Sequence, residues 1–186
     1  MLGIDPGLTR CGVGVVDVAA DRSATLVHVG VIRSEPHEPI EERLAVIAAG
    51  IRAVVDQHGP RVIAVERVFA QHNRQTVMGT AQASGIALLI AGERGLRAAT
   101  HTPTEVKAAI TGYGAADKRQ VQTMVARILG LDDLPRPADA ADALALAICH
   151  AWRGGAPVAA SGTLTPAQRA WQDAERVART NVRTRP

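Results

Sequence analysis

Apolar residues alternate with polar or small ones in three stretches near the N-terminus, Leu2–Asp5, Gly12–Val18 and Thr25–Ile32. These stretches are rich in β-branched side chains and are separated by turn-forming residues, so the pattern predicts three consecutive strands. The next segment, PIEERLAVIAAGIRAVVDQHG, repeats apolar residues at helical spacing, which predicts a helix that ends at Gly59. The run RVIAVE then predicts a short buried strand that ends at Glu66.

In the second half of the chain the pattern predicts a strand at 96–100 and helices at 75–94, 117–129 and 138–152. Another helix begins in TPTEVKAAI, where Thr102, Pro103 and Glu105 match an N-cap, a first-turn proline and a capping-box partner. The helix at 75–94 carries many small residues, which suit close packing either on the sheet or against a second copy of itself. This order predicts an α/β fold with a central five-stranded mixed sheet flanked by helices.

The length of 186 residues and the 47% hydrophobic content fit one domain with a full core. The segment GGAPVAASGT is typical of a linker, and the residues after it predict a marginal helix or a disordered tail. We therefore divide the chain into a domain over 1–155 and a basic, flexible tail over 156–186. The tail holds five arginines and two acids, which accounts for the formal net charge of +3. A nucleic-acid surface on the balanced body must then come from local segregation of charge.

Two observations concern the compartment. No apolar run approaches the roughly 18 residues that span a bilayer, and the N-terminus lacks the pattern of a signal peptide. Cys11 and Cys149 lie far apart in apolar contexts, without a CxxC pattern or clustered histidines. They fit reduced core thiols, so we expect a cytoplasmic protein with no membrane association.

Four acidic residues stand at the ends of predicted elements. Asp139 and Asp142 open the otherwise apolar helix of PADAADALALAICH, and alone they fit solvated side chains favoured by the helix dipole. Asp5 and Glu66 each end a strand, where an aspartate is more often a turn former. In the predicted topology, however, both strands are central and end at the same edge of the sheet, where open α/β sheets place their sites. We expect all four carboxylates to converge there.

Such convergence needs a counter-charge, because close anions repel and raise each other's pKa values. Mg²⁺ prefers oxygen ligands, and two ions about 3.5 to 4 Å apart can clamp the attacking and leaving oxygens of a phosphodiester. We expect two Mg²⁺ ions per site, with Mn²⁺ as a substitute, bound by Asp5, Glu66, Asp139 and Asp142. The sequence shows neither a zinc-type His/Cys cluster nor the phosphate loop GxxxxGK[ST].

Five segments in order resemble the RuvC family of bacterial Holliday-junction resolvases: GIDPGLTRCGVGVV, AVERVF, TPTEVKAAITGYG, ADKRQVQTMV and ADAADALALAICH. Each is weak alone, but five in order are specific. The resemblance implies a ribonuclease-H-like fold of the retroviral integrase superfamily. It also implies a homodimeric, Mg²⁺-dependent endonuclease that nicks two like-polarity strands of a four-way junction symmetrically. The products are 5′-phosphate and 3′-hydroxyl ends, and the family's partners are the branch-migration proteins RuvA and RuvB.

The resemblance assigns the family's catalytic carboxylates to Asp5, Glu66, Asp139 and Asp142. It also matches Lys107 and Lys118 to family lysines near the scissile backbone. These are the only two lysines among 21 basic residues. A compact ammonium approaches a phosphate without the fixed fork of a guanidinium, so we favour a role at the phosphate over chance placement.

Further DNA contacts are expected in the polar loop after the fourth strand. Phe69, the only phenylalanine, has core packing as its usual role. In a polar loop, however, an exposed aromatic can wedge against an unstacked base at the junction centre, a role that the resemblance supports. Arg67, His72 and Arg74 are either contacts to the DNA backbone or solvated loop residues. We also include Arg119, next to one of the two lysines, among the DNA-binding residues.

Two other function classes compete with this interpretation. GIDPGLTRCGVGVV also resembles the phosphate-binding turn of actin-like ATPases and sugar kinases, but those proteins need a second such domain, for which this length leaves no room. A catalytically inactive junction-binding module is the other alternative. The complete set of four acids argues against it.

Overall fold

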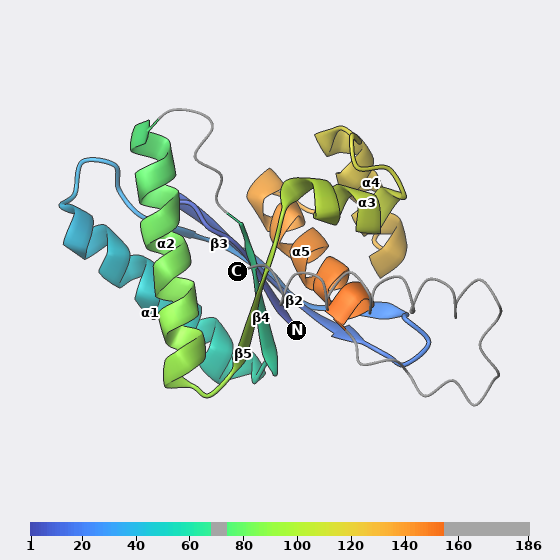
Figure 1. The fold of residues 1–186 in the computed structure, drawn as a ribbon, viewed down its shortest axis with the longest axis horizontal. Coiled ribbons are helices and arrows are strands. Elements are labelled where there is room, and N and C mark those ends of the chain that lie inside the picture. Colours follow the sequence, from blue (N-terminus) through green and yellow to red (C-terminus); the bar gives the residue numbers. More distant parts are fainter. Residues whose placement is uncertain (68–73, 155–186) are drawn as a thin grey trace, which may run out of the picture. The chain divides into compact units, whose positions relative to one another are not determined.

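The computed structural model describes residues 1–67 and 74–154, and the elements follow the order that the sequence predicts (Figure 1). The strands are β1 (Leu2–Asp5), β2 (Arg10–Val18), β3 (Ala24–Arg33), β4 (Val62–Glu66) and β5 (Arg97–His101). The helices are α1 (Ile40–His58), α2 (Arg74–Glu93), α3 (Pro103–Thr111), α4 (Lys118–Leu129) and α5 (Ala138–Gly154). The predicted tail lies outside the described residues, so the domain boundary stays a prediction.

The five strands form one mixed sheet in the order β3-β2-β1-β4-β5. β1, β2 and β3 pair antiparallel, whereas β1 with β4 and β4 with β5 pair parallel. The prediction of a five-stranded sheet that is antiparallel first and parallel later is therefore confirmed. As predicted, β1 and β4 are central neighbours that end at the same edge.

Two strand boundaries differ from the prediction in a way that matters for the site. β2 begins at Arg10 rather than at Gly12, because Arg10 and Cys11 pair with Arg33 and Ile32 of β3. β5 extends to His101, which is the partner of Glu66 in the parallel register. Cross-strand pairing sets both ends, and local alternation of side chains does not report it.

Helices cover both faces of the sheet, α1 and α2 on one side and α3 to α5 on the other (Figure 1). Branched residues of the strands pack against α1 and α2, and the buried apolar side chains among the described residues of α2 are Ala83, Ala87, Ile90 and Ala91. The small residues on this face of α2 therefore serve packing on the sheet. The opposite face of the same helix is exposed.

Helix α5 lies unusually close to the sheet because the strands beneath it carry glycines. A Cβ atom added at Gly3 would collide with the backbone oxygen of Ala143, and one at Gly12 with that of Asp139. The helix contributes fully buried residues, among them Leu144. Its first turn is thereby fixed directly over the ends of β1 and β2.

Capping follows the sequence pattern. Thr102 and Glu105 form the predicted capping box at α3, and Asp117 and Gln120 form another at α4. Gly59 ends α1 in the left-handed conformation that glycine tolerates best. Among the described helices, none is long and apolar enough to cross a bilayer.

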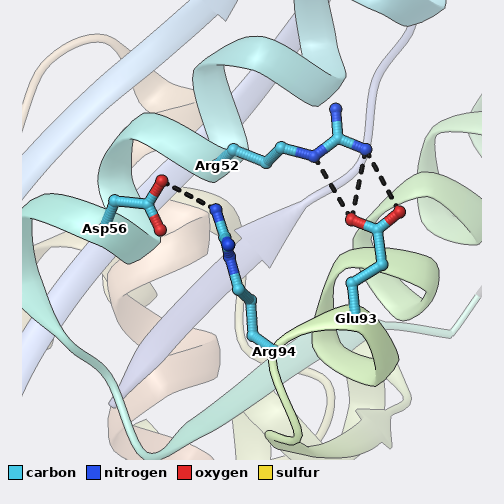
Figure 2. Close-up of polar contacts among 4 residues, drawn as sticks. All are labelled: Arg52, Asp56, Glu93 and Arg94. Atoms are coloured by element: carbon cyan, nitrogen blue, oxygen red, sulfur yellow. Dashed lines mark hydrogen bonds and ion pairs between the residues drawn. The ribbon is translucent and has the colours of Figure 1, made fainter.

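Two ion pairs at the surface join α1 to the last residue of α2 and to the residue that follows it (Figure 2). Arg52 pairs with Glu93 at 3.2 Å, and Arg94 pairs with Asp56 at 2.7 Å. All four side chains are substantially exposed. Pairs of this kind contribute about 0 to 1 kcal/mol each, so packing holds the two helices together far more than charge does.

Candidate active site

Asp5 and Glu66 lie side by side at one edge of the sheet. They end β1 and β4, whose parallel register places Ile4 opposite Val65. Their carboxyl groups are hydrogen-bonded to each other, which requires a proton on one of them. The two acids that the sequence assigned to strand ends are therefore in direct contact.

Burial and mutual repulsion perturb this pair strongly. Burial, followed by the charge of Glu66, raises the pKa of Asp5 to about 8, with further increments from Asp142 and Asp139. Burial also raises the pKa of Glu66, although the hydrogen bond from Asp5 and the charge of Lys118 oppose the increase. All four predicted carboxylates thus interact electrostatically, as expected for converging acids with too little positive charge nearby.

The other two acids stand on the first turns of α5, and each contacts a cation. Arg10 Nε donates to Asp139 Oδ2 at 2.6 Å, and Lys118 Nζ lies 2.8 Å from Asp142 Oδ2. Partial burial lowers the pKa of Lys118, but the hydrogen bond and charge of Asp142 outweigh it and raise the pKa overall. The ammonium therefore stays charged at neutral pH.

Arg10 is a member of this cluster that the sequence did not single out. It begins β2, in a part of the chain that the alternation pattern assigned to a turn. One sequence signal could have identified Arg10. It lies two residues before Gly12, and residues two apart in a strand lie on the same face, which here is the face that α5 covers. Its partner Asp139 lies 129 residues away in the sequence.

Three other predicted residues whose side chains the structure describes make no hydrogen bond or ion pair with the four carboxylates. Lys107 lies on α3, and its ammonium makes no hydrogen bond or ion pair within residues 1–67 and 74–154. Arg67 is tied to β5, donating from its backbone to His101 O at 2.8 Å and from Nη2 to Thr100 Oγ1 at 3.2 Å. Arg119 lines a groove of about 450 Å³ formed by α4 and the turn that joins it to the end of α3.

The other DNA contacts predicted in the loop after β4 involve side chains that the structure does not describe. Phe69 and His72 lie outside the described residues, and so does the side chain of Arg74, whose backbone begins α2. Their assignment to DNA binding stays a prediction.

The donor set fits a hard divalent cation by its chemistry. All four candidate ligands are carboxylates, and the raised pKa values of Asp5 and Glu66 show that their negative charge is under-compensated. Nevertheless, among the described residues no three acidic, histidine or cysteine side chains form a ready-made metal-binding group. A cation would have to draw Asp139 and Asp142 inward from Arg10 and Lys118.

Comparisons with known proteins agree with one another. Residues 1–150 match the family described as "Crossover junction endodeoxyribonuclease RuvC". A relative of that name from Leifsonia xyli is 62% identical, and the match covers 95% of this chain and 91% of the relative.

Solved structures give the same result. The chain is similar to Thermus thermophilus RuvC in complex with a Holliday junction substrate, with a TM-score of 0.78 and 39% identity over 82% of this chain and 93% of that one. The yeast mitochondrial Holliday junction resolvase has a TM-score of 0.55 at 12% identity over 80% of this chain and 77% of that one, which supports the fold alone.

Proposed function

The chain belongs to the RuvC family of crossover junction endodeoxyribonucleases, and from this membership we propose that it resolves four-way DNA junctions. The reaction is the metal-dependent, symmetric nicking of two like-polarity strands during recombination and repair. Water adds to the phosphorus and the bond to the 3′ oxygen breaks, which leaves a 5′-phosphate and a 3′-hydroxyl.

One observation carries this proposal for the site itself. Four carboxylates from β1, β4 and α5 interact at one edge of the sheet, and burial together with the neighbouring acids raises the pKa of Asp5 to about 8. We assign Mg²⁺, two ions per site, to Asp5, Glu66, Asp139 and Asp142, with Mn²⁺ as a substitute. The bound ions supply the positive charge that activates water and stabilises the leaving oxygen.

The residues of the chain have separable tasks in this scheme. The close packing of α5 on Gly3 and Gly12 holds Asp139 and Asp142 in place. The Lys118 ammonium, within 2.8 Å of Asp142, is placed to meet a phosphate oxygen beside the carboxylates. Lys107 has the same role in our assignment, supported by its being the only other lysine.

Further DNA contacts complete the proposal. Phe69 is assigned to wedge against bases at the junction centre. The backbone contacts are assigned to Arg67, His72, Arg74 and Arg119. We place the enzyme in the cytoplasm, as a partner of the RuvA and RuvB branch-migration proteins.

The decisive experiment compares a synthetic four-way junction with a linear duplex of the same sequence, each with and without Mg²⁺. We expect paired nicks in two like-polarity strands of the junction only, and only with Mg²⁺. Equal cutting of the linear duplex would contradict junction specificity. Tight junction binding without any cutting in Mg²⁺ or Mn²⁺ would favour the inactive binding module.

The exposed face of α2 supports a homodimer. Met78 and Leu89 are 62% and 54% exposed, and Gly85 and Gly92 share their stripe of the helix. A Cβ atom at either glycine would meet nothing within 4 Å among the described residues. Packing within the chain therefore does not require these glycines, whereas close approach of a second copy would.

Gly85→Arg tests this dimer. The substitution meets open space in the monomer, so we expect a folded protein whose mass by light scattering falls from dimer to monomer and whose nicks are no longer paired. Gln57→Arg adds the same charge at an exposed position of α1 and should stay dimeric. A Gly85→Arg protein that remains dimeric would remove α2 from the interface.

A further inference from the structure

The contact between Arg10 and Asp139 has no assigned task in the reaction described above. Its Nε to Oδ2 distance of 2.6 Å is that of a strong charge-assisted hydrogen bond. The Arg10 side chain is 41% exposed, and its remaining guanidinium nitrogens donate to none of the described residues. One edge of the guanidinium therefore holds a carboxylate while the other faces solvent.

The fold brings Arg10 to this position for a local reason. Asp5 pairs with Gly12 across β1 and β2, so β2 extends two residues beyond the end of β1. Arg10 lies on that extension, on the same face as Gly12, whose missing side chain lets α5 approach. Arg10 therefore lies at the end of the sheet where β1 ends in Asp5.

Lys118 makes a similar contact with the second aspartate. Arg10 from β2 and Lys118 from α4 flank the start of α5, and each takes one of its two aspartates. Four carboxylates thus face two cations. A divalent ion that takes Asp139 as a ligand, as the proposed site requires, meets Arg10 on the same carboxylate.

We propose that Arg10 exchanges partners during the reaction: it competes with the divalent cation for Asp139, and when the cation takes that carboxylate it binds a phosphate oxygen of the DNA. A guanidinium suits both partners, since its planar donors match a carboxylate and a phosphodiester equally well. This inference rests on the proposed metal site, and its test separates the two.

The first measurement is Mn²⁺ binding to the full chain without DNA, followed by the electron paramagnetic resonance of free Mn²⁺. Arg10→Met keeps the length of the side chain and removes its charge. Because it deletes a competitor for Asp139, we expect the Kd for Mn²⁺ to fall roughly two- to fivefold, the factor that an exposed ion pair typically contributes.

Arg33→Met is the matched control. Arg33 is the partner of Arg10 across β2 and β3, is exposed, and contacts no acidic side chain among the described residues. It should therefore change the Kd for Mn²⁺ less than Arg10→Met does. An equal change in both variants, or weaker Mn²⁺ binding by Arg10→Met, would overturn the competition.

The second measurement is junction affinity by fluorescence anisotropy. With Ca²⁺ present, Arg10→Met should weaken binding more than Arg33→Met and reduce the slope of log K against log salt by about 0.9, the loss of one phosphate contact. With a chelator, the two variants should bind alike, because Arg10 then remains on Asp139. A Ca²⁺-independent loss would overturn the exchange.

The wild-type protein distinguishes failure of this inference from failure of the proposed function. If the wild-type protein binds no Mn²⁺, or if Asp142→Asn binds Mn²⁺ as tightly as wild type does, the proposed metal ligands are wrong. The proposed exchange by Arg10 is then refuted as well. If wild type binds Mn²⁺ through Asp142 and Arg10→Met behaves as Arg33→Met does, only the exchange is wrong. Arg10→Gln repeats each measurement with a polar replacement.

Discussion

Four of the ion pairs among the described residues lie at two places, between α1 and the end of α2 and around the start of α5. The first place holds two arginines and two acids, in pairs at 3.2 and 2.7 Å (Figure 2). The second holds pairs at 2.6 and 2.8 Å, with similar exposure of the cations. Pair geometry alone would not tell one from the other.

The difference lies in what surrounds the pairs. Between α1 and α2 every acid of the cluster has its own arginine. At the start of α5, two additional acids stand behind the pairs, and burial raises the pKa of one of them, Asp5, to about 8. Unbalanced and buried charge, rather than the presence of ion pairs, therefore distinguishes the proposed reaction site from a surface link.

The largest expected contrast is between two carboxamide substitutions, one at each place. Asp142→Asn removes a proposed metal ligand that also holds Lys118, so junction cutting should fall more than the roughly 10–100-fold typical of losing an outer-shell partner. Junction binding should persist, because the change removes a negative charge near the DNA. Cutting is measured by single-turnover gel assay and binding by anisotropy.

Glu93→Gln makes the same chemical change in the α1–α2 pair and should cut at the wild-type rate. If Asp142→Asn keeps Mg²⁺-dependent cutting, the ligand assignment is wrong. If Glu93→Gln loses cutting as well, the two places are not functionally distinct.

The sequence was informative about the acids because their signals are local. Asp5 and Glu66 follow short apolar runs that define strand ends, and Asp139 and Asp142 open an apolar helix. Parallel pairing of β1 with β4 then follows from the order of the elements. Convergence of the four acids could therefore be predicted before any contact was known.

Arg10 could not be predicted in this way, because its role depends on a partner 129 residues away and on a strand end set by pairing with Arg33. The small residues of α2 were ambiguous for another reason. Ala83 and Ala87 face the sheet whereas Gly85 faces outward, so packing on the sheet accounts for only part of the pattern. The abundance of small residues in this segment does not show which of them face the sheet and which face outward.

A smaller effect is expected from pH. Folding raises the pKa of Asp5 from 3.8 to about 8. Between these values the native protein holds a proton that the unfolded chain has lost, so without metal its stability falls as pH rises through this window. A divalent cation replaces the proton, so the increase in Tm caused by Ca²⁺ should grow from pH 6 to pH 8.5.

Controls separate this effect from other titrations. The pKa values of His101 and His150 are lowered, first by burial, which reduces stability below about pH 6.5 with or without metal. That contribution cancels in the difference between samples with and without Ca²⁺. Asp5→Asn should abolish the pH dependence of the Ca²⁺ shift, and Glu93→Gln should retain it. A wild-type shift that is the same at pH 6 and pH 8.5 would refute the proton exchange.

The smallest effect belongs to the surface pairs. A double-mutant cycle of Arg52→Ala and Glu93→Ala, measured by urea denaturation, should give a coupling free energy of about 0.2 to 1 kcal/mol, because both side chains are well solvated. Raising the salt to 0.5 M should reduce it further by screening. A coupling well above 1 kcal/mol that persists in salt would mean that the Arg52–Glu93 pair is not an ordinary solvated surface pair. Only the effect on junction cutting would then distinguish the α1–α2 ion pairs from those at the start of α5.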